Sequence, residues 1–152
     1  ACVDHRAHDT VSGLRDALKE AAPDGIDVYF ENVGGPVLEA TLPQMNRFGR
    51  IPLCGMIAWY NAGGLGDGAS SQGLTGPKLW RTLLVNHLTV TGFIIANHWD
   101  RYGEFLTEVA PMVADGRVKY EEDITEGLEN APQAFMDMLR GGNTGKTIVK
   151  VG

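Results

Sequence analysis

Asn32 is the residue whose position most strongly indicates chemistry. Together with Glu31 it follows an apolar run, residues 25–30, and it precedes Gly34, Gly35 and a proline. This pattern predicts a buried strand that leads through a tight turn into a helix. In open α/β sheets, ligands bind outside the carboxyl ends of such strands. Asn32 is therefore placed where a cofactor or a substrate would lie.

Two further candidates follow another predicted strand end, in the run CGMIAWY. Tyr60 can donate a hydrogen bond or a proton to an oxygen that gains negative charge, and a loop aromatic that covers the core is the alternative. Cys54 lies beside Gly55, where a small buried apolar residue is favoured over a nucleophile. Asn143 lies in GGNTGK, a turn between a helix and a strand, where asparagine ordinarily serves as a left-handed turn residue.

Two other patterns match known motifs only formally. Residues 64–69 fit the G-x-G-x-x-A spacing of a dinucleotide-binding turn, but no strand ends directly before them and no amphipathic helix opens from them. We expect a flexible loop there. Cys2, His5 and His8 are spaced by three residues, yet no CxxC or HExxH pattern completes a metal site. We therefore expect no metal site.

The elements that must position these residues alternate between strands and helices. Strands are predicted at residues 1–4, 26–30, 50–54, 88–95, 118–121 and 147–151. Helices are predicted to begin near Val11, Pro36, Lys78, Trp99 and Ala131, and Pro43 should shorten the second of them. Alternation through residue 114 implies a parallel sheet with right-handed crossovers, and the rest of the chain predicts strand, helix, strand.

Composition narrows the class of protein. The 152 residues are 43% apolar and 21% charged, which is typical of one soluble globular domain, and the net charge of −6 argues against nucleic-acid binding. No apolar run approaches the roughly 20 residues that span a bilayer. Two cysteines and no signal-peptide pattern favour the cytoplasm. The opening without methionine predicts a piece of a longer protein, and a chain that starts here by design is the alternative.

Several short motifs occur in an order that one family shares. They are DVYFENVGG at 27–35, QM at 44–45 with FGRI at 48–51, CGMI at 54–57 with YN at 60–61, GFII at 92–95, EGLENAP at 126–132 and N-x-GK at 143–146. The ordered set resembles the zinc-independent medium-chain dehydrogenase/reductases. It is most similar to the branch of leukotriene B4 12-hydroxydehydrogenase and prostaglandin reductase, which includes 2-alkenal and curcumin reductases. The resemblance covers the whole chain.

The resemblance implies an α/β fold, a partial Rossmann fold. The Rossmann fold is a doubly wound parallel sheet, and the part that this chain matches lacks the first strands of that sheet. A strand-helix-strand segment of the catalytic domain follows it. Residues 1–116 correspond to the later part of the NADP-binding Rossmann domain, and residues 117–152 to the closing segment of the GroES-like catalytic domain. The amino-terminal catalytic region, the glycine-rich turn and the strand with the basic residue for the 2′-phosphate are missing.

The resemblance also implies a cofactor, NADPH, and residues that bind it. Asn32 would line the cofactor cleft, and Cys54, Gly55 and Tyr60 would wrap the nicotinamide half. Phe93, Ile94 and Ile95 would flank the nicotinamide, and Asn143 would reach the cofactor from the closing segment. Tyr60 would also be the catalytic residue, because it would support the enolate oxygen. His5 stands where the family often has a tyrosine beside the cofactor phosphate, so the preference for NADPH rests on the family.

The resemblance further implies a reaction and partners. Hydride would pass from the nicotinamide to the β-carbon of a small enone or enal, with no nucleic acid and no membrane involved. A homodimer would form through the edge strand that begins at Leu88 and ends at Ile95. We expect the isolated chain to bind NADPH very weakly, because the pyrophosphate site is absent. The alternative is a catalytically silent truncated fragment that acts only as a dimerisation or folding module.

Overall fold

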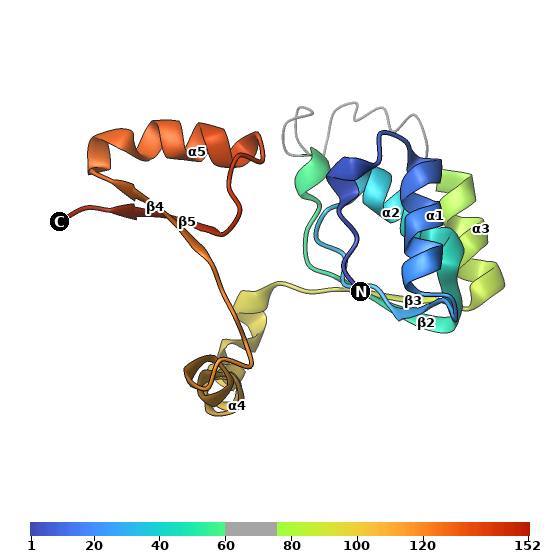
Figure 1. The fold of residues 1–152 in the computed structure, drawn as a ribbon. Coiled ribbons are helices and arrows are strands. Elements are labelled where there is room, and N and C mark those ends of the chain that lie inside the picture. Colours follow the sequence, from blue (N-terminus) through green and yellow to red (C-terminus); the bar gives the residue numbers. More distant parts are fainter. Residues whose placement is uncertain (60–75) are drawn as a thin grey trace. The chain divides into compact units, whose positions relative to one another are not determined.

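Two units make up the fold, Ala1–His98 and Trp99–Gly152. The computed structural model describes residues 1–59 and 76–152 of the chain (Figure 1). Tyr60 and the glycine pattern at 64–69 lie outside the described residues.

A parallel sheet forms the centre of the first unit. Its strands are β1 (Ile26–Val28), β2 (Met45–Leu53) and β3 (Thr89–Gly92), and they lie in the order β1-β2-β3. Arg50 on β2 pairs with Val28 on β1 and with Thr89 on β3. Both crossovers contain a helix, as parallel neighbours require. The predicted α/β class is therefore confirmed.

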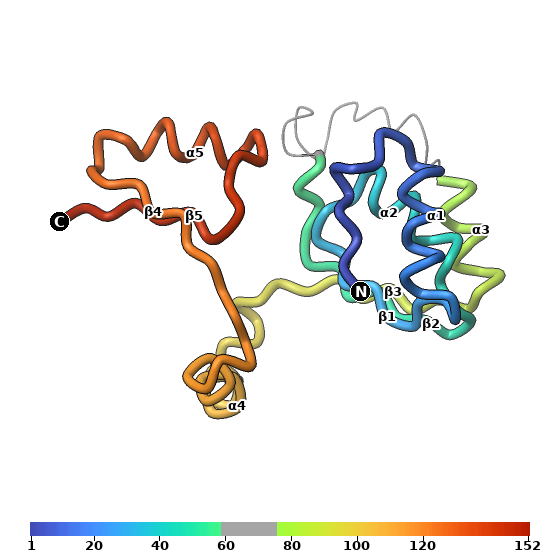
Figure 2. Tube along the Cα trace, in the orientation of Figure 1, coloured from blue at the N-terminus to red at the C-terminus, as the bar shows by residue number. Residues whose placement is uncertain are grey.

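Three helices lie on one face of this sheet, as the ribbon and the tube both show (Figures 1 and 2). They are α1 (Val11–Ala21), α2 (Gly35–Thr41) and α3 (Gly76–Asn86), with short 3-10 helices at η1 (His5–Ala7), η2 (Leu42–Gln44) and η3 (Ile57–Trp59). The Thr10 hydroxyl starts α1 by accepting a hydrogen bond from the Gly13 N–H, 3.1 Å away. As predicted, Pro43 shortens α2, which gives way to a 3-10 turn at Leu42.

The core of the first unit lies between the sheet and these helices. Leu42, Met45 and Ile51 are its buried centre. Partly buried apolar side chains pack around them: Ile26, Tyr29, Leu38, Leu79 and Leu88. The register of β1 shifts between Ile26 and Val28, and the residues on either side of Tyr29, Val28 and Phe30, are exposed.

The second unit is built on a strand-helix-strand motif. The 3-10 helix η4 (Ile95–Arg101) spans the boundary between the units, and α4 (Tyr102–Ala114) follows it. The strands β4 (Glu122–Glu126) and β5 (Lys146–Lys150) then pair in parallel, joined by η5 (Leu128–Asn130) and α5 (Ala131–Leu139). The predicted strand-helix-strand order of this part of the chain is confirmed.

Three predicted strands differ from the observed ones. Residues 1–4 form no strand: the Asp4 carboxyl instead accepts a hydrogen bond from the Arg6 N–H and starts η1. The strand predicted at 118–121 lies at Glu122–Glu126, because its register with β5 begins at Glu122. The strand predicted at 50–54 already begins at Met45, and Phe48, with a φ of 63°, breaks the alternation that would have revealed this start.

Candidate functional site

The candidate site lies at the edge of the first sheet where all three strands end. Because the strands are parallel, their carboxyl ends share this edge. Backbone hydrogen bonds continue past the regular strands: Glu31 N–H donates to the Pro52 carbonyl at 2.8 Å, and Cys54 N–H to the Glu31 carbonyl at 2.8 Å. On the far side, Phe93 N–H donates to the Leu53 carbonyl at 3.1 Å. The predicted residues that follow β1, β2 and β3 therefore lie along one edge.

The segment after β2 is bound to the loop after β1. Ile57 N–H donates to the Asn32 carbonyl at 3.3 Å, and Ala58 N–H to the Val33 carbonyl at 2.8 Å. Gly35 has a φ of 53°, and a Cβ on it would lie 3.1 Å from the Ala58 methyl group. Glycine is therefore needed for this close approach, which makes the two segments one structural element.

Glu31 holds the turn that carries Asn32. Its side chain is 2% exposed, and its Oε1 accepts hydrogen bonds from the N–H groups of Val33 and Gly34, each at 2.7 Å. Within the described residues, Glu31 Oε2 and the Tyr29 hydroxyl are buried without a hydrogen-bond partner. Burial, and then the neighbouring Glu31 carboxyl, raise the pKa of Tyr29 well above its ordinary value. Glu31 was not assigned to the site from the sequence, although an acidic residue between an apolar strand and two glycines is a visible signal.

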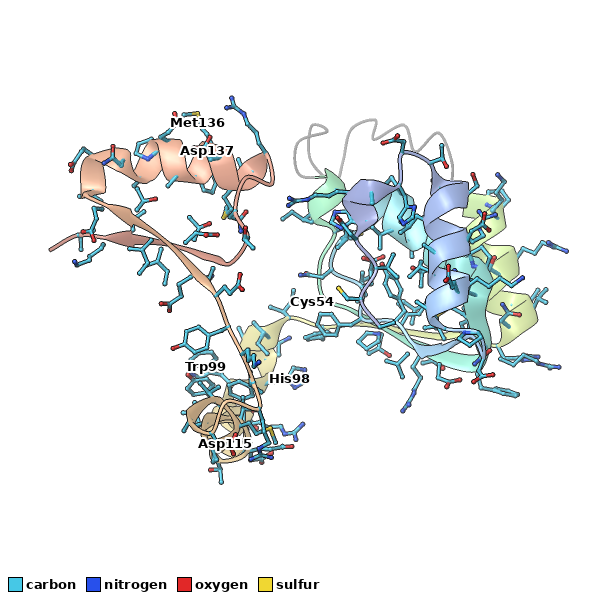
Figure 3. All side chains as sticks on the ribbon, viewed as in Figure 1. Cys54, His98, Trp99, Asp115, Met136 and Asp137 are labelled. Carbon is cyan, nitrogen blue, oxygen red and sulfur yellow. The ribbon has the colours of Figure 1, made fainter. Side chains whose placement is uncertain are left out.

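Asn32 and Cys54 present polar groups at this edge. Both side chains are exposed, and no hydrogen bond of either one is found among the described residues. Cys54 follows β2 with a free thiol and is labelled in Figure 3. The prediction of a buried apolar Cys54 is thus wrong, because its strand ends before it and its side chain reaches the surface. Gly55 is held by its N–H, which donates to the Glu31 carbonyl at 3.2 Å.

An apolar surface adjoins these polar groups. The Phe93 ring meets the Phe30 ring edge-on, with centroids 5.9 Å apart, and the His98 ring at 6.1 Å. Ile94 and Ile95 come next and leave more than half of their surface exposed, at 63% and 64%. The edge therefore combines amide and backbone polar groups with exposed apolar side chains, the two kinds of group that line sites for small organic ligands.

Asn143 belongs to the second unit, in the turn before β5. Its side-chain N–H group donates to the Gly145 carbonyl at 2.8 Å, which is the turn role that the sequence favours, although its φ is not left-handed. Asp123 Oδ2 fixes the same turn by accepting from the N–H groups of Thr144 and Gly145, each at 2.7 Å. Asp123 was not found from the sequence, because it is remote from the turn in the chain and only strand pairing brings them together.

The described residues were also compared with the requirements of a metal site and of a membrane-spanning helix. Among residues 1–59 and 76–152, no group of three or more His, Cys, Asp and Glu side chains is placed to hold a metal ion. The helices in the same part of the chain are all too short or too polar to cross a bilayer.

A parallel α/β sheet with exposed polar and apolar side chains at its carboxyl edge has the architecture in which α/β proteins bind their ligands. The family model described as zinc-binding dehydrogenase matches residues 1–149, and the chain belongs to this family of medium-chain dehydrogenase/reductases. The resemblance drawn from the sequence motifs is confirmed.

Two curated relatives with similar sequence identity to this chain are named as reductases. The chain is 42% identical over 151 residues to NADPH-dependent curcumin reductase of Escherichia coli, covering 99% of this chain and 41% of that protein. It is 45% identical over 145 residues to prostaglandin reductase 1 of Mus musculus, covering 93% and 41%. The crystal structure of CurA from Vibrio vulnificus in complex with NADPH matches with a TM-score of 0.83 and 41% identity, covering 99% of this chain and 43% of that one. The chain thus spans about two fifths of the length of these relatives.

Proposed function

We propose that this chain is part of an NADPH-dependent reductase that reduces the C=C bond of α,β-unsaturated aldehydes and ketones. Under this proposal, residues 1–116 belong to the NADP-binding domain and residues 117–152 close the catalytic domain. The observation that carries the proposal is the meeting of the Asn32 loop, the Cys54–Gly55 segment and Phe93 at one sheet edge. Similarity over nearly the whole chain to an NADPH-dependent curcumin reductase, and to CurA in its complex with NADPH, supports it.

The residues at this edge fit the nicotinamide end of the cofactor. A carboxamide needs both donors and acceptors, which the Asn32 side chain and the backbone around Gly55 offer. A flat ring needs an apolar wall, which Phe93, Ile94 and Ile95 offer. Bound NADPH supplies the hydride, and these residues orient the ring and keep water from it. Asn143 is proposed to contact the cofactor from the second unit through its side-chain oxygen, since its N–H group is engaged in the turn.

Tyr60 is the proposed catalytic residue. When hydride adds to the β-carbon of an enone, negative charge develops on the carbonyl oxygen. A hydroxyl that donates a hydrogen bond to this oxygen stabilises the charge more in the transition state than in the bound substrate. Removing it should therefore lower kcat more than it weakens cofactor binding.

A second candidate function is that of a dimerisation or folding module. All four residues of β3 are exposed, and β3 lies at the edge of the described sheet. An edge strand carries unpaired N–H and C=O groups on its outer side, which a second copy can pair with. Under this alternative the chain associates through residues 88–95 and has no catalytic activity of its own.

Replacement of a matching segment tests the first proposal. In the E. coli curcumin reductase, the region that aligns with this chain is exchanged for residues 1–152, and NADPH oxidation is followed with an enone substrate. We expect enone-dependent turnover, and we expect Tyr60→Phe in the same protein to reduce kcat with little change in the KM for NADPH. A folded replacement protein that binds no NADPH and reduces no enone would refute the proposal.

Measurement on the chain alone separates the second candidate. Sedimentation velocity gives the association state of the 152-residue chain, and NADPH fluorescence gives its affinity. We expect very weak NADPH binding, because no phosphate-binding turn is found in the sequence. A dimer that is abolished by Val90→Lys on β3, together with an inactive replacement protein, would favour the module instead.

A further inference from the structure

We propose that Glu31 is a positioning residue: its buried carboxyl fixes the Asn32 turn, and its backbone carbonyl holds the Cys54–Gly55 segment, in the arrangement that receives the nicotinamide. This inference rests on the proposed function. Glu31 itself is not assigned any contact with the cofactor, because its side chain is 2% exposed.

The hydrogen bonds of Glu31 connect it to β2, to the segment after β2 and to the turn into α2. Its N–H donates to Pro52 on β2, and its carbonyl accepts from Cys54 and Gly55. Its Oε1 accepts from the N–H groups of Val33 and Gly34 at 2.7 Å each. One residue therefore connects the end of β1, the segment after β2 and the turn into α2.

The hydrogen bonds of the Glu31 side chain bind only the turn that follows it. Without Oε1, the N–H groups of Val33 and Gly34 would lose their acceptor, and no other acceptor for them is found in the described part of the chain. Asn32 lies in the chain between Glu31 and these two N–H groups. The hydrogen bonds from Val33 and Gly34 back to Glu31 therefore fix the backbone conformation of Asn32. A ligand that binds a fixed group loses less freedom than one that must order it.

Burial of a carboxyl group is unfavourable unless hydrogen bonds compensate for lost hydration. The two hydrogen bonds that Oε1 accepts from Val33 and Gly34 supply this compensation. An apolar residue of similar size would avoid this cost but would release the turn. A role in orienting the site explains why a carboxyl group occupies this position better than a role in packing does.

The test compares Glu31→Gln, which keeps an oxygen acceptor, with Glu31→Leu, which removes it. Glu39→Gln on α2 is the control, since Glu39 makes no side-chain hydrogen bond or ion pair that the described residues reveal. In the 152-residue chain, amide hydrogen exchange of Val33 and Gly34 should accelerate at least about tenfold in Glu31→Leu, because an N–H that loses its acceptor opens more readily. Exchange in Glu31→Gln should stay close to wild type.

Cofactor affinity provides the functional readout in the replacement protein. We expect Glu31→Leu to weaken NADPH binding about tenfold, Glu31→Gln to restore most of the affinity, and Glu39→Gln to leave it unchanged. Circular dichroism and unfolding midpoints are measured in parallel. If Glu31→Leu does not fold, Glu31→Asp takes its place, because it keeps the acid but shortens its reach.

The outcomes separate the two proposals. Wild-type affinity in all Glu31 variants would overturn the positioning role while leaving the reductase proposal intact. A loss of affinity that only follows the unfolded fraction would overturn it as well, since Glu31 would then serve stability alone. A wild-type replacement protein that neither binds NADPH nor reduces an enone would overturn the reductase proposal and this inference together.

Discussion

Gly34→Ala should destabilise the first unit because of backbone strain at the entrance to α2. Gly34 has a φ of 76° and a ψ of −158°, a region that is essentially restricted to glycine. It is also buried, and its N–H is bound to Glu31. A side chain at such a position costs about 1–3 kcal/mol. The same substitution should also move the N–H group away from Glu31 and so disturb the Asn32 turn.

Gly92→Ala is the matched control, since it makes the same chemical change in the same unit. Gly92 has no positive φ, and nothing described lies within 4 Å of the Cβ that would be added. An alanine at a compatible position stabilises by about 0.4–1 kcal/mol, because the unfolded chain loses freedom. The two variants should therefore differ by about 1.5–4 kcal/mol with opposite signs relative to wild type.

Native-state hydrogen exchange of β2 amides measures this difference. It reports the opening of the first unit even if the second unit unfolds separately. The expected difference is a sizeable part of the 5–15 kcal/mol that ordinarily stabilises a domain, so it is well within reach of the method. Equal protection of the β2 amides in the two variants would refute the assignment of strain to Gly34.

Three further outcomes are expected. Leu42→Ala, at a side chain that is 1% exposed, should lower the free energy of unfolding by about 2–5 kcal/mol in a urea titration, whereas Leu84→Ala at an exposed site should change it by less than about 0.5 kcal/mol. The raised pKa of Tyr29 means that the folded state holds the phenol proton more tightly than the unfolded state. The contribution of Tyr29 to the free energy of unfolding is therefore complete below about pH 10 and is lost as the pH rises above that value. In alkaline unfolding curves, Tyr29→Phe should remove this pH-dependent loss of stability. Hydrogen bonds from the side chain and then the backbone N–H of Arg117 lower the pKa of Asp115, so the stabilising contribution of Asp115 is present above its ordinary pKa and is lost as the pH falls through the lowered value. In a carboxyl NMR titration, Arg117→Gln should raise that pKa toward its ordinary range, because only the backbone hydrogen bond remains.

The alternation of strands and helices could be predicted because local sequence determines it. Apolar runs such as residues 26–30, glycine or proline at their ends and helical spacing between them are all visible without a structure. Since parallel strands place their carboxyl ends together, the grouping of Asn32, Cys54 and Phe93 followed from the order of the elements. The edge positions of β1 and β3 followed from the same order.

The remaining features depend on contacts between residues that are remote in sequence. Glu31 looks like an ordinary polar residue after a strand, and only the fold shows that it is buried against the turn. In β4 the polar Asp123 faces inward while Ile124 is 55% exposed, which reverses the usual alternation and conceals the strand. Residues 1–4 have a strand-like composition but no partner to pair with among the described strands. Composition alone does not supply a partner.

The strand order β1-β2-β3 has a consequence for the way the first unit assembles during translation. Each of the three described strands pairs beside the one synthesised before it, so none of these three has to insert between two that are already joined. The helix that connects them leaves the ribosome before the strand that it delivers, and the sheet can grow from one side as the chain emerges. Substitutions that weaken β1 should therefore impair every later step of assembly, whereas those in β3 should affect only the last addition.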